Sequence, residues 1–135
     1  MKNRIYYSSL IILILSVGCA KNEPILPEAG REQCQYCSMS IVDFRFHAQF
    51  LTQKGRRYYF DSIECLQSYI RENQPAIRSI WVSDFENPGK MLLEPNAVFV
   101  QSESIHSPMG RGLGAFRSLE RAKSYLTLHT GILIQ

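Results

Sequence analysis

Two segments of the chain are similar to each other, FDSIECLQSYI at 60–70 and FRSLERAKSYL at 116–126. Five of the eleven aligned positions are identical, and isoleucine and leucine exchange at two more. Both segments have apolar residues at helical spacing. A repeated amphipathic helix needs neighbouring elements to cover its apolar face, so the similarity predicts two copies of one structural unit. Chance similarity between two amphipathic helices is the alternative.

The residues around the first segment predict strands. SIVDFRFHAQFLT places apolar side chains at every second position, which is typical of a strand with one buried face. Lys54 and Gly55 then predict a turn, and Pro75 ends the helix that Asp61 and Ser62 begin. The first unit is expected to contain a strand at 40–52, a return strand at 56–60, a helix at 61–73 and a strand at 76–85.

The second unit is predicted to be a shortened copy of the first. It is expected to contain a strand at 94–103, a Gly-rich loop at 107–116, the repeated helix and a closing strand at 130–135. Neither unit is large enough to bury a core by itself. We therefore expect an α+β fold in which two tandem ββαβ units, residues 34–90 and 91–135, pack together.

Composition restricts the chain to a small globular class. It has 135 residues, of which 45% are hydrophobic and 20% charged, with 7 Tyr, 7 Phe and 1 Trp. Such a chain is too apolar to be disordered and too short for a large multidomain enzyme. KGRR at 54–57 is more simply a hairpin turn than a phosphate-binding patch, and the net charge is only +3. No nucleic-acid partner is expected.

The first two dozen residues have the layout of a secretory signal. A basic start precedes an apolar core at 10–17, which is too short to span a membrane. SVGC at 16–19 resembles a bacterial lipoprotein box, with serine in place of the usual leucine. We expect a signal peptide at 1–18, lipidation of Cys19, and a polar linker at 19–33 that tethers the protein to a membrane, facing the periplasm. A plain cleaved signal with an incidental cysteine is the alternative.

After lipidation of the first cysteine, Cys34, Cys37 and Cys65 remain. An odd number of thiols in an oxidising compartment leaves at least one that is free, intermolecular or bound to metal. Two of them belong to the motif Cys34-x-x-Cys37-x-Met39, which precedes the first predicted strand. A thioredoxin-type pair would lie at the start of a helix, and haem attachment would need a histidine where Ser38 stands. Thiol-disulfide exchange is therefore the weaker interpretation.

Two metals suit these residues. Zinc could be bound by the three thiolates with His47 or His106 as the fourth ligand, but Ser68 stands where a second Cys-x-x-Cys would end. Cu(I) is selected by a thiolate together with a thioether. Cys37 and Met39 are two residues apart, so both side chains point to the same side of an extended segment. Spacing alone leaves both metals open.

Four other side chains are assigned by their position. The repeat relates Met39 in CSM to Met109 in SPM, so Met109 is a candidate third ligand, and His106 is a further candidate three residues before it. His47 falls on the face of its predicted strand opposite the phenylalanines, and we expect it at the surface. Asp61 is expected to cap the helix and not to form an acid–base pair with Asp43.

Taken together, these residues resemble the NosL family, the copper-binding accessory lipoproteins of nitrous oxide reductase maturation. The resemblance covers nearly the whole mature chain. Its parts are, in order, QYCSMSI at 35–41, YYFDSIECLQSYI at 58–70, WVSDF at 81–85, AVFVQSES at 97–104, SPMGRGLGAF at 107–116 and FRSLERAKSYLTLHTGILI at 116–134. Ser38 replaces the glycine of the family's Cys-Gly-Met signature, and Thr130 replaces one glycine of its His-Gly-Gly.

The resemblance implies a periplasm-facing Cu(I) metallochaperone that is not an enzyme. It also implies delivery of copper to the maturation machinery of the reductase, an ABC-type complex with an associated periplasmic protein. Cys37 and Met39 match the family's ligand motif, and Met109 matches the methionine of its second half. Cys34 and Cys65 go beyond that motif, and three thiolates would also tolerate zinc.

The fold of the family also resembles a domain of organomercurial lyase, which makes such an enzyme a formal alternative. That enzyme uses thiols and an acid to protonate a carbon–mercury bond. We expect no thiol and carboxylate arranged for this proton transfer.

Overall fold

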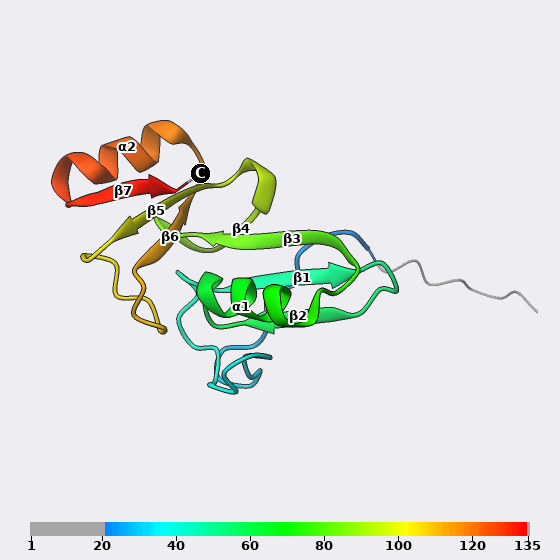
Figure 1. Cartoon of the computed structure of the whole chain (residues 1–135). Helices are drawn as coiled ribbons and strands as arrows, with labels where there is room; N and C mark the ends of the chain where they lie inside the picture. Colours follow the sequence, from blue (N-terminus) through cyan, green and yellow to red (C-terminus); the bar gives the residue numbers. More distant parts are fainter. Residues whose placement is uncertain (1–20, 135) are drawn as a thin grey trace, which may run out of the picture.

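The computed structural model describes residues 21–134, which form one sheet with a helix beside each half (Figure 1). The predicted signal peptide and the predicted lipidation of Cys19 lie outside the described residues. Within 21–134, no helix is both long enough and apolar enough to cross a membrane.

The first half contains β1 (Ala48–Thr52), β2 (Arg57–Phe60), α1 (Ile63–Asn73), β3 (Ile77–Asp84) and β4 (Asn87–Leu93). The predicted hairpin is present, and Gly55, with φ of 85°, supplies the left-handed backbone of its turn. α1 begins after Ser62, which caps it, and ends at Gln74 in the left-handed conformation, just before Pro75. The predicted helix and the strand after it are confirmed.

The second half contains the 3₁₀ turn η1 (Glu94–Asn96), β5 (Val98–Ser102), β6 (Leu113–Phe116), α2 (Leu119–Leu128) and β7 (Gly131–Ile134). The Gly-rich stretch forms a long loop whose last residues become β6. The predicted second helix and closing strand are confirmed. The order of elements therefore repeats that of the first half, with β4 and η1 between the two.

All seven strands belong to one sheet. The strand order is β2-β1-β3 in the first half and β6-β5-β7 in the second, so each half has its first strand in the middle. The halves join where β3 and β6 pair in parallel at Asp84 and Ala115, and β4 pairs with β3. The expected α+β class is confirmed. The division at residue 90, and the descent of the second half from the first, stay predictions.

Each half has an apolar core beneath its helix. In the first half, the rings of Phe50 and Phe60 lie 5.9 and 5.4 Å from that of Tyr69 on α1. In the second half, the ring of Phe116 lies 5.3 Å from that of Tyr125 on α2. The three phenylalanines have no exposed surface, and each contributes roughly 2 to 3 kcal/mol by leaving water. These contacts fix both helices against the sheet.

The strand predicted at 40–52 is wrong over its first half, because only Ala48–Thr52 is paired as a strand of the sheet. Residues 44–46 form a turn instead. The carboxylate of Asp43 accepts hydrogen bonds from the backbone N–H and the guanidinium of Arg45, each at 3.0 Å. An aspartate that binds the backbone two residues later favours a turn over an extended chain.

The linker predicted at 19–33 is not free of the folded body. The backbone N–H and C=O of Ile25 both pair with the side-chain amide of Gln49 on β1, each at 3.0 Å. Neighbouring residues of a strand point to opposite faces, and Phe50 points toward α1. The N-terminal segment therefore lies on the face of β1 that α1 leaves open.

Candidate metal centre

The start of α1 places one thiol in the protein interior. Ser62 caps the helix, and its hydroxyl accepts a hydrogen bond from the N–H of Cys65 at 3.1 Å. The cap fixes the first turn, so Cys65 lies inside the helix–sheet interface with no exposed surface. Its position therefore depends on the cap as well as on packing.

The Cys-x-x-Cys-x-Met segment is a closed loop and not part of a strand. The N–H of Cys34 donates to the C=O of Met39 at 2.8 Å, and the N–H of Ser38 donates to the C=O of Cys34 at 2.9 Å. Ser38 has a φ of 63°, a left-handed conformation that explains why a glycine would suit this position. The N–H of Gln35 donates to the C=O of Tyr59 at 2.9 Å, which holds the loop against β2. Two bonds inside the loop and one to the sheet thus fix both cysteines.

The loop and the helix bring four side chains together, Cys34, Cys37, Asp61 and Cys65. One ligand atom of each, a sulfur or a carboxylate oxygen, lies within 4.8 Å of all the others. Ligand atoms about 2.3 Å from a shared ion lie roughly 3.8 to 4.6 Å apart. The cluster therefore fits a single soft metal ion with small movements, and all three thiols are free.

Asp61 is the residue that the sequence interpretation missed. Ser62, and not Asp61, caps α1. The carboxylate of Asp61 accepts a hydrogen bond from the thiol of Cys37 at 3.3 Å, and its Oδ1 is buried without a hydrogen-bond partner in residues 21–134. A thiol and a carboxylate therefore do lie together, while the expectation that none is arranged for proton transfer to a carbon–mercury bond stays a prediction. The available signal was an aspartate four residues before Cys65, at the entrance of the helix.

The thiols differ in acidity. The Cys65 thiol donates to the Cys34 sulfur, which lowers the pKa of Cys34 to about 6 in spite of burial and raises the pKa of Cys65. Burial raises the pKa of Cys37 to about 11, and hydrogen bonding to Cys34 and Asp61 adds to that effect. The lowered pKa favours the thiolate of Cys34, the form that binds a cation, and the raised pKa values favour the protonated thiols of Cys37 and Cys65.

The two predicted thioethers lie at the surface. Met39 is 53% exposed and Met109 41% exposed. Met109 lies in the turn from Ser107 to Gly110, which is closed by a backbone hydrogen bond of 2.9 Å. The structure thus gathers the predicted cysteines and leaves both methionines on the outside. Their role as ligands stays a prediction.

The predicted histidines separate in the same way. His106 is exposed in the loop before β6. His47 is fully buried, so the expectation of a surface position is wrong. Its Nδ1 lies 2.9 Å from the C=O of Phe60 and its Nε2 lies 3.1 Å from the amide of Gln49, while burial lowers its pKa to about 4. Both ring nitrogens already have protein partners, which disfavours His47 as a metal ligand.

A buried carboxylate at the start of α1 ties the Met109 loop to the helix that carries Cys65. Glu64, next to Cys65 in α1, accepts a hydrogen bond from the hydroxyl of Ser107 at 2.5 Å. That hydroxyl also accepts a hydrogen bond from the N–H of Gly112 at 3.0 Å. The loop of the second half is therefore docked on the first turn of α1.

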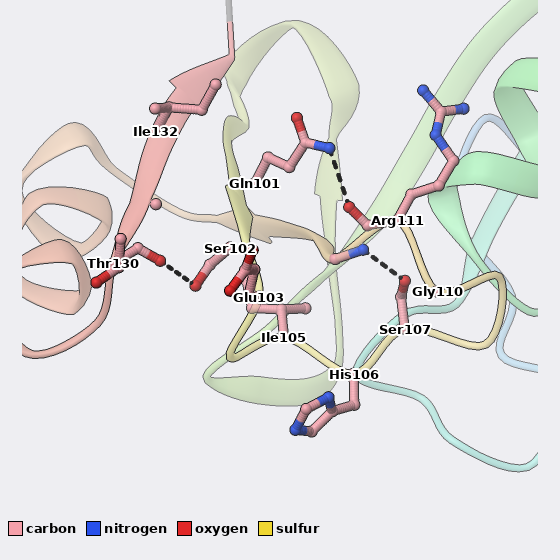
Figure 2. Close-up of a pocket in the computed structure, with 12 residues that line it drawn as sticks. Gln101, Ser102, Glu103, Ile105, His106, Ser107, Gly110, Arg111, Thr130 and Ile132 are labelled. Carbon is pink, nitrogen blue, oxygen red and sulfur yellow. Dashed lines mark hydrogen bonds between the residues drawn. The ribbon is translucent and has the colours of Figure 1, made fainter.

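The same loop borders an open cavity of about 510 Å³, shown in Figure 2. Ser107 and Gly112 line it together with residues of β5 and the start of β7. The side chain of His106 lies at its lower edge in this view. None of its lining residues belongs to the cysteine cluster. The cysteine cluster, in which only Cys37 is partly exposed, is thus a separate site and not the floor of this cavity.

Comparison with known proteins gives two findings. The model of the NosL family matches residues 26–135. Among solved structures, the crystal structure of the copper chaperone NosL from Shewanella denitrificans has the same fold, with a TM-score of 0.70 and 20% sequence identity. The match covers 84% of this chain and 94% of that one. No curated protein sequence matches.

Proposed function

Because this chain belongs to the NosL family, we propose that it is a Cu(I) metallochaperone that binds one ion in the cysteine cluster. The observation that carries the proposal is the convergence of three thiol sulfurs and one carboxylate within 4.8 Å. Thiolates are soft ligands, and Cu(I) is the soft ion that accepts two or three of them. Cys34 and Cys65, which are buried, and Cys37, which is half-buried, are the proposed ligands.

The exposed methionines have a role that burial would prevent. Met39 follows Cys37 by two residues, and Met109 is held by the loop docked on α1. Thioethers bind Cu(I) at any pH because they carry no proton to lose. We assign Met39 and Met109 to the arrival and departure of the ion, and the thiols to its retention. Such stepwise exchange passes the ion between proteins without releasing it to water.

Zinc is the second candidate, and Asp61 is the observation that favours it. Three thiolates and one carboxylate are a complete tetrahedral ligand set for zinc. A structural zinc ion would stabilise the first half, because metal binding and folding are coupled. The same thiol and carboxylate pair also suits an organomercurial-lyase-like or thiol-exchange activity, but membership of NosL favours a binding protein without turnover.

The proposed setting follows from the N-terminal sequence and the family resemblance. A lipid on Cys19 would hold the chaperone on a membrane, facing the periplasm. There it would deliver copper to an ABC-type complex and its associated periplasmic protein, which mature nitrous oxide reductase. No nucleic acid is involved in this proposal.

Titration with Cu(I) against a chromogenic chelator tests the site. The purified protein should bind one Cu(I). Cys34→Ser and Cys37→Ser should each lower the affinity by more than the roughly 100-fold that outer residues contribute. Met39→Leu and Met109→Leu should change the affinity less and slow the transfer of Cu(I) to the chelator more. Wild-type affinity in both serine variants would show that the ion binds elsewhere.

The zinc candidate predicts a different result in the same preparation. The protein would then be isolated with one zinc ion, and a chelator that removes it would unfold the chain. If the metal-free protein keeps its melting temperature and the zinc-free thiols take up Cu(I), the zinc candidate is excluded.

A further inference from the structure

The N-terminal segment is bound to the sheet almost from the first residue that the structure describes. The side-chain carbonyl of Asn22 accepts a hydrogen bond from the hydroxyl of Ser79 at 2.8 Å. The backbone C=O of Glu23 accepts one from the guanidinium of Arg57 at 2.7 Å. The chain is therefore attached to the folded body from residue 22 onward, and not only from the end of the predicted linker.

These contacts place Asn22 and Glu23 at one end of the molecule. Ser79 pairs with Leu51 near the end of β1, and Arg57 is the first residue of β2. Both lie next to the turn of the β1–β2 hairpin. In Figure 1 the start of the coloured chain, in blue, lies beside this hairpin.

The distance to the predicted lipid is short. Only two residues separate Cys19 from Asn22, and an extended chain advances about 3.5 Å per residue. Asn22 can therefore lie no more than about 10 Å from the lipid-bearing residue. A lipid on Cys19 would place this end of the protein at the membrane surface.

The hairpin end carries positive charge. Lys21, Lys54, Arg56 and Arg78 are all exposed there. The hairpin holds Arg78 in place, since its guanidinium donates to the C=O of Gln53 at 2.8 Å. Among the described residues, none of the four basic side chains has a carboxylate within ion-pair distance. Two acidic residues lie near this charge: the exposed Glu23, whose backbone C=O binds Arg57, and Glu94, which lines a small cavity with Arg78.

The cysteine cluster lies at the other end of these elements. β2 runs from the hairpin to Asp61, and α1 starts there and returns toward the hairpin (Figure 1). Cys65 is in the first turn of α1, whereas the last turn points back to the hairpin end. A membrane at the hairpin would therefore leave the cysteine cluster facing away from the lipid.

From this placement the geometry points to a membrane-docking surface formed by Lys21, Lys54, Arg56 and Arg78, which binds anionic lipid headgroups and aims the metal site toward the periplasm. The inference rests on the proposed lipidation of Cys19 and does not depend on which metal is bound. Each basic side chain near an anionic surface favours the docked orientation by about fivefold. Charge and anchor thus act together, as they do in proteins with two membrane-binding signals.

Lysine labelling tests this surface. The full chain, processed in bacteria and purified in detergent, is reconstituted into vesicles of phosphatidylcholine or of phosphatidylcholine mixed with phosphatidylglycerol. A water-soluble amine reagent then modifies exposed lysines, and mass spectrometry reports the rate at each one. We expect labelling of Lys54 to slow severalfold on the anionic vesicles. Lys123 on α2 should be labelled on the vesicles at the same rate as in detergent.

Charge reversal and salt supply the controls. Arg56→Glu combined with Arg78→Glu should restore the labelling of Lys54, whereas Arg111→Glu combined with Arg117→Glu, an equal charge change in the second half, should not. High salt should restore it in the unmodified protein, because screening weakens exposed charge interactions. The salt measurement decides the question even if the first double variant folds poorly.

Three results would overturn the inference. Equal rates at Lys54 and Lys123 on anionic vesicles would show that the hairpin does not dock. Equal protection on both vesicle types would show that charge is not involved. Protection in intact cells but not on vesicles would assign the surface to a protein partner. Copper titration of the same variants separates these outcomes from failure of the chaperone proposal, because the hairpin residues do not belong to the cysteine cluster.

Discussion

The two helices of this protein begin with the same serine cap, but the residues that the caps hold differ in kind. Ser62 caps α1 by accepting a hydrogen bond from the N–H of Cys65 at 3.1 Å. Ser118 caps α2 by accepting one from the N–H of Arg121 at 3.3 Å. Cys65 is buried among thiols, whereas Arg121 pairs with Glu86 at 2.6 Å. A shared backbone therefore does not imply a shared site.

The residues before and after each cap also differ in burial: they are buried in the first half and exposed in the second. Asp61 is buried beside the thiols, and Arg117 at the matching position of the second half is exposed. Glu64 is buried and accepts a hydrogen bond from the hydroxyl of Ser107, while the matching Glu120 is exposed. The candidate metal site thus depends on the side chains around a common cap and not on the cap itself.

Replacement of the third residue of each helix should give the largest difference. Cys65→Ser should lower the Cu(I) affinity by more than about 100-fold, because it removes a proposed ligand. Arg121→Ser at the matching position should leave the affinity unchanged and cost no more than about 1 kcal/mol of stability. Chelator competition measures both affinities. A similar loss in the two variants would mean that the halves contribute equally to the site.

The two glutamates should differ next in size of effect. Glu64→Ala should lower the free energy of unfolding by about 2 to 3 kcal/mol, since it leaves the buried Ser107 hydroxyl and the N–H of Leu113 without their acceptor. Glu120→Ala, at an exposed position, should change it by less than about 0.5 kcal/mol. Urea unfolding of both variants provides the comparison. Equal values would show that the loop is not docked through Glu64.

His47 should make the first half sensitive to acid. Burial lowers its pKa from 6.5 to about 4. Between pH 6.5 and pH 4 this histidine is therefore protonated in the unfolded chain but neutral in the folded one. Stability is therefore present above pH 6.5 and is lost as the pH falls toward 4, by about 2 kcal/mol at pH 5. Urea unfolding at pH 7 and pH 5 measures this loss. His47→Gln should remove that part of the pH dependence, and His106→Gln, at an exposed position, should retain it.

The two caps should give the smallest effect and the most equal one. Ser62→Ala and Ser118→Ala should each lower the free energy of unfolding by about 1 kcal/mol, because each leaves one helix N–H without its acceptor. Only Ser62→Ala should also weaken Cu(I) binding, since it frees the turn that holds Cys65. Calorimetry with and without Cu(I) distinguishes the two contributions. A metal effect from Ser118→Ala would contradict the assignment of the site to α1.

Local sequence determined most of the secondary structure and half of the site. The turn at Gly55, the stop at Pro75 and the apolar periods of both helices act over a few residues, so their outcome is readable without the fold. The motif of Cys37 and Met39 predicted soft-metal chemistry for the same reason, and the structure places Cys37 in the cluster. The similarity of the two helix segments also predicted the repeated order of elements.

Tertiary structure decided which side chains meet. Asp61, directly after β2, becomes part of the cluster only because the loop that carries Cys37, 24 residues away in the chain, is held against β2. Burial of His47 depends on β2 and on Gln49, and docking of the N-terminal segment depends on Ser79, 57 residues from Asn22. These contacts join distant parts of the chain, and no period or cap encodes them. The residue types were therefore legible in the sequence, whereas their convergence required the packed sheet.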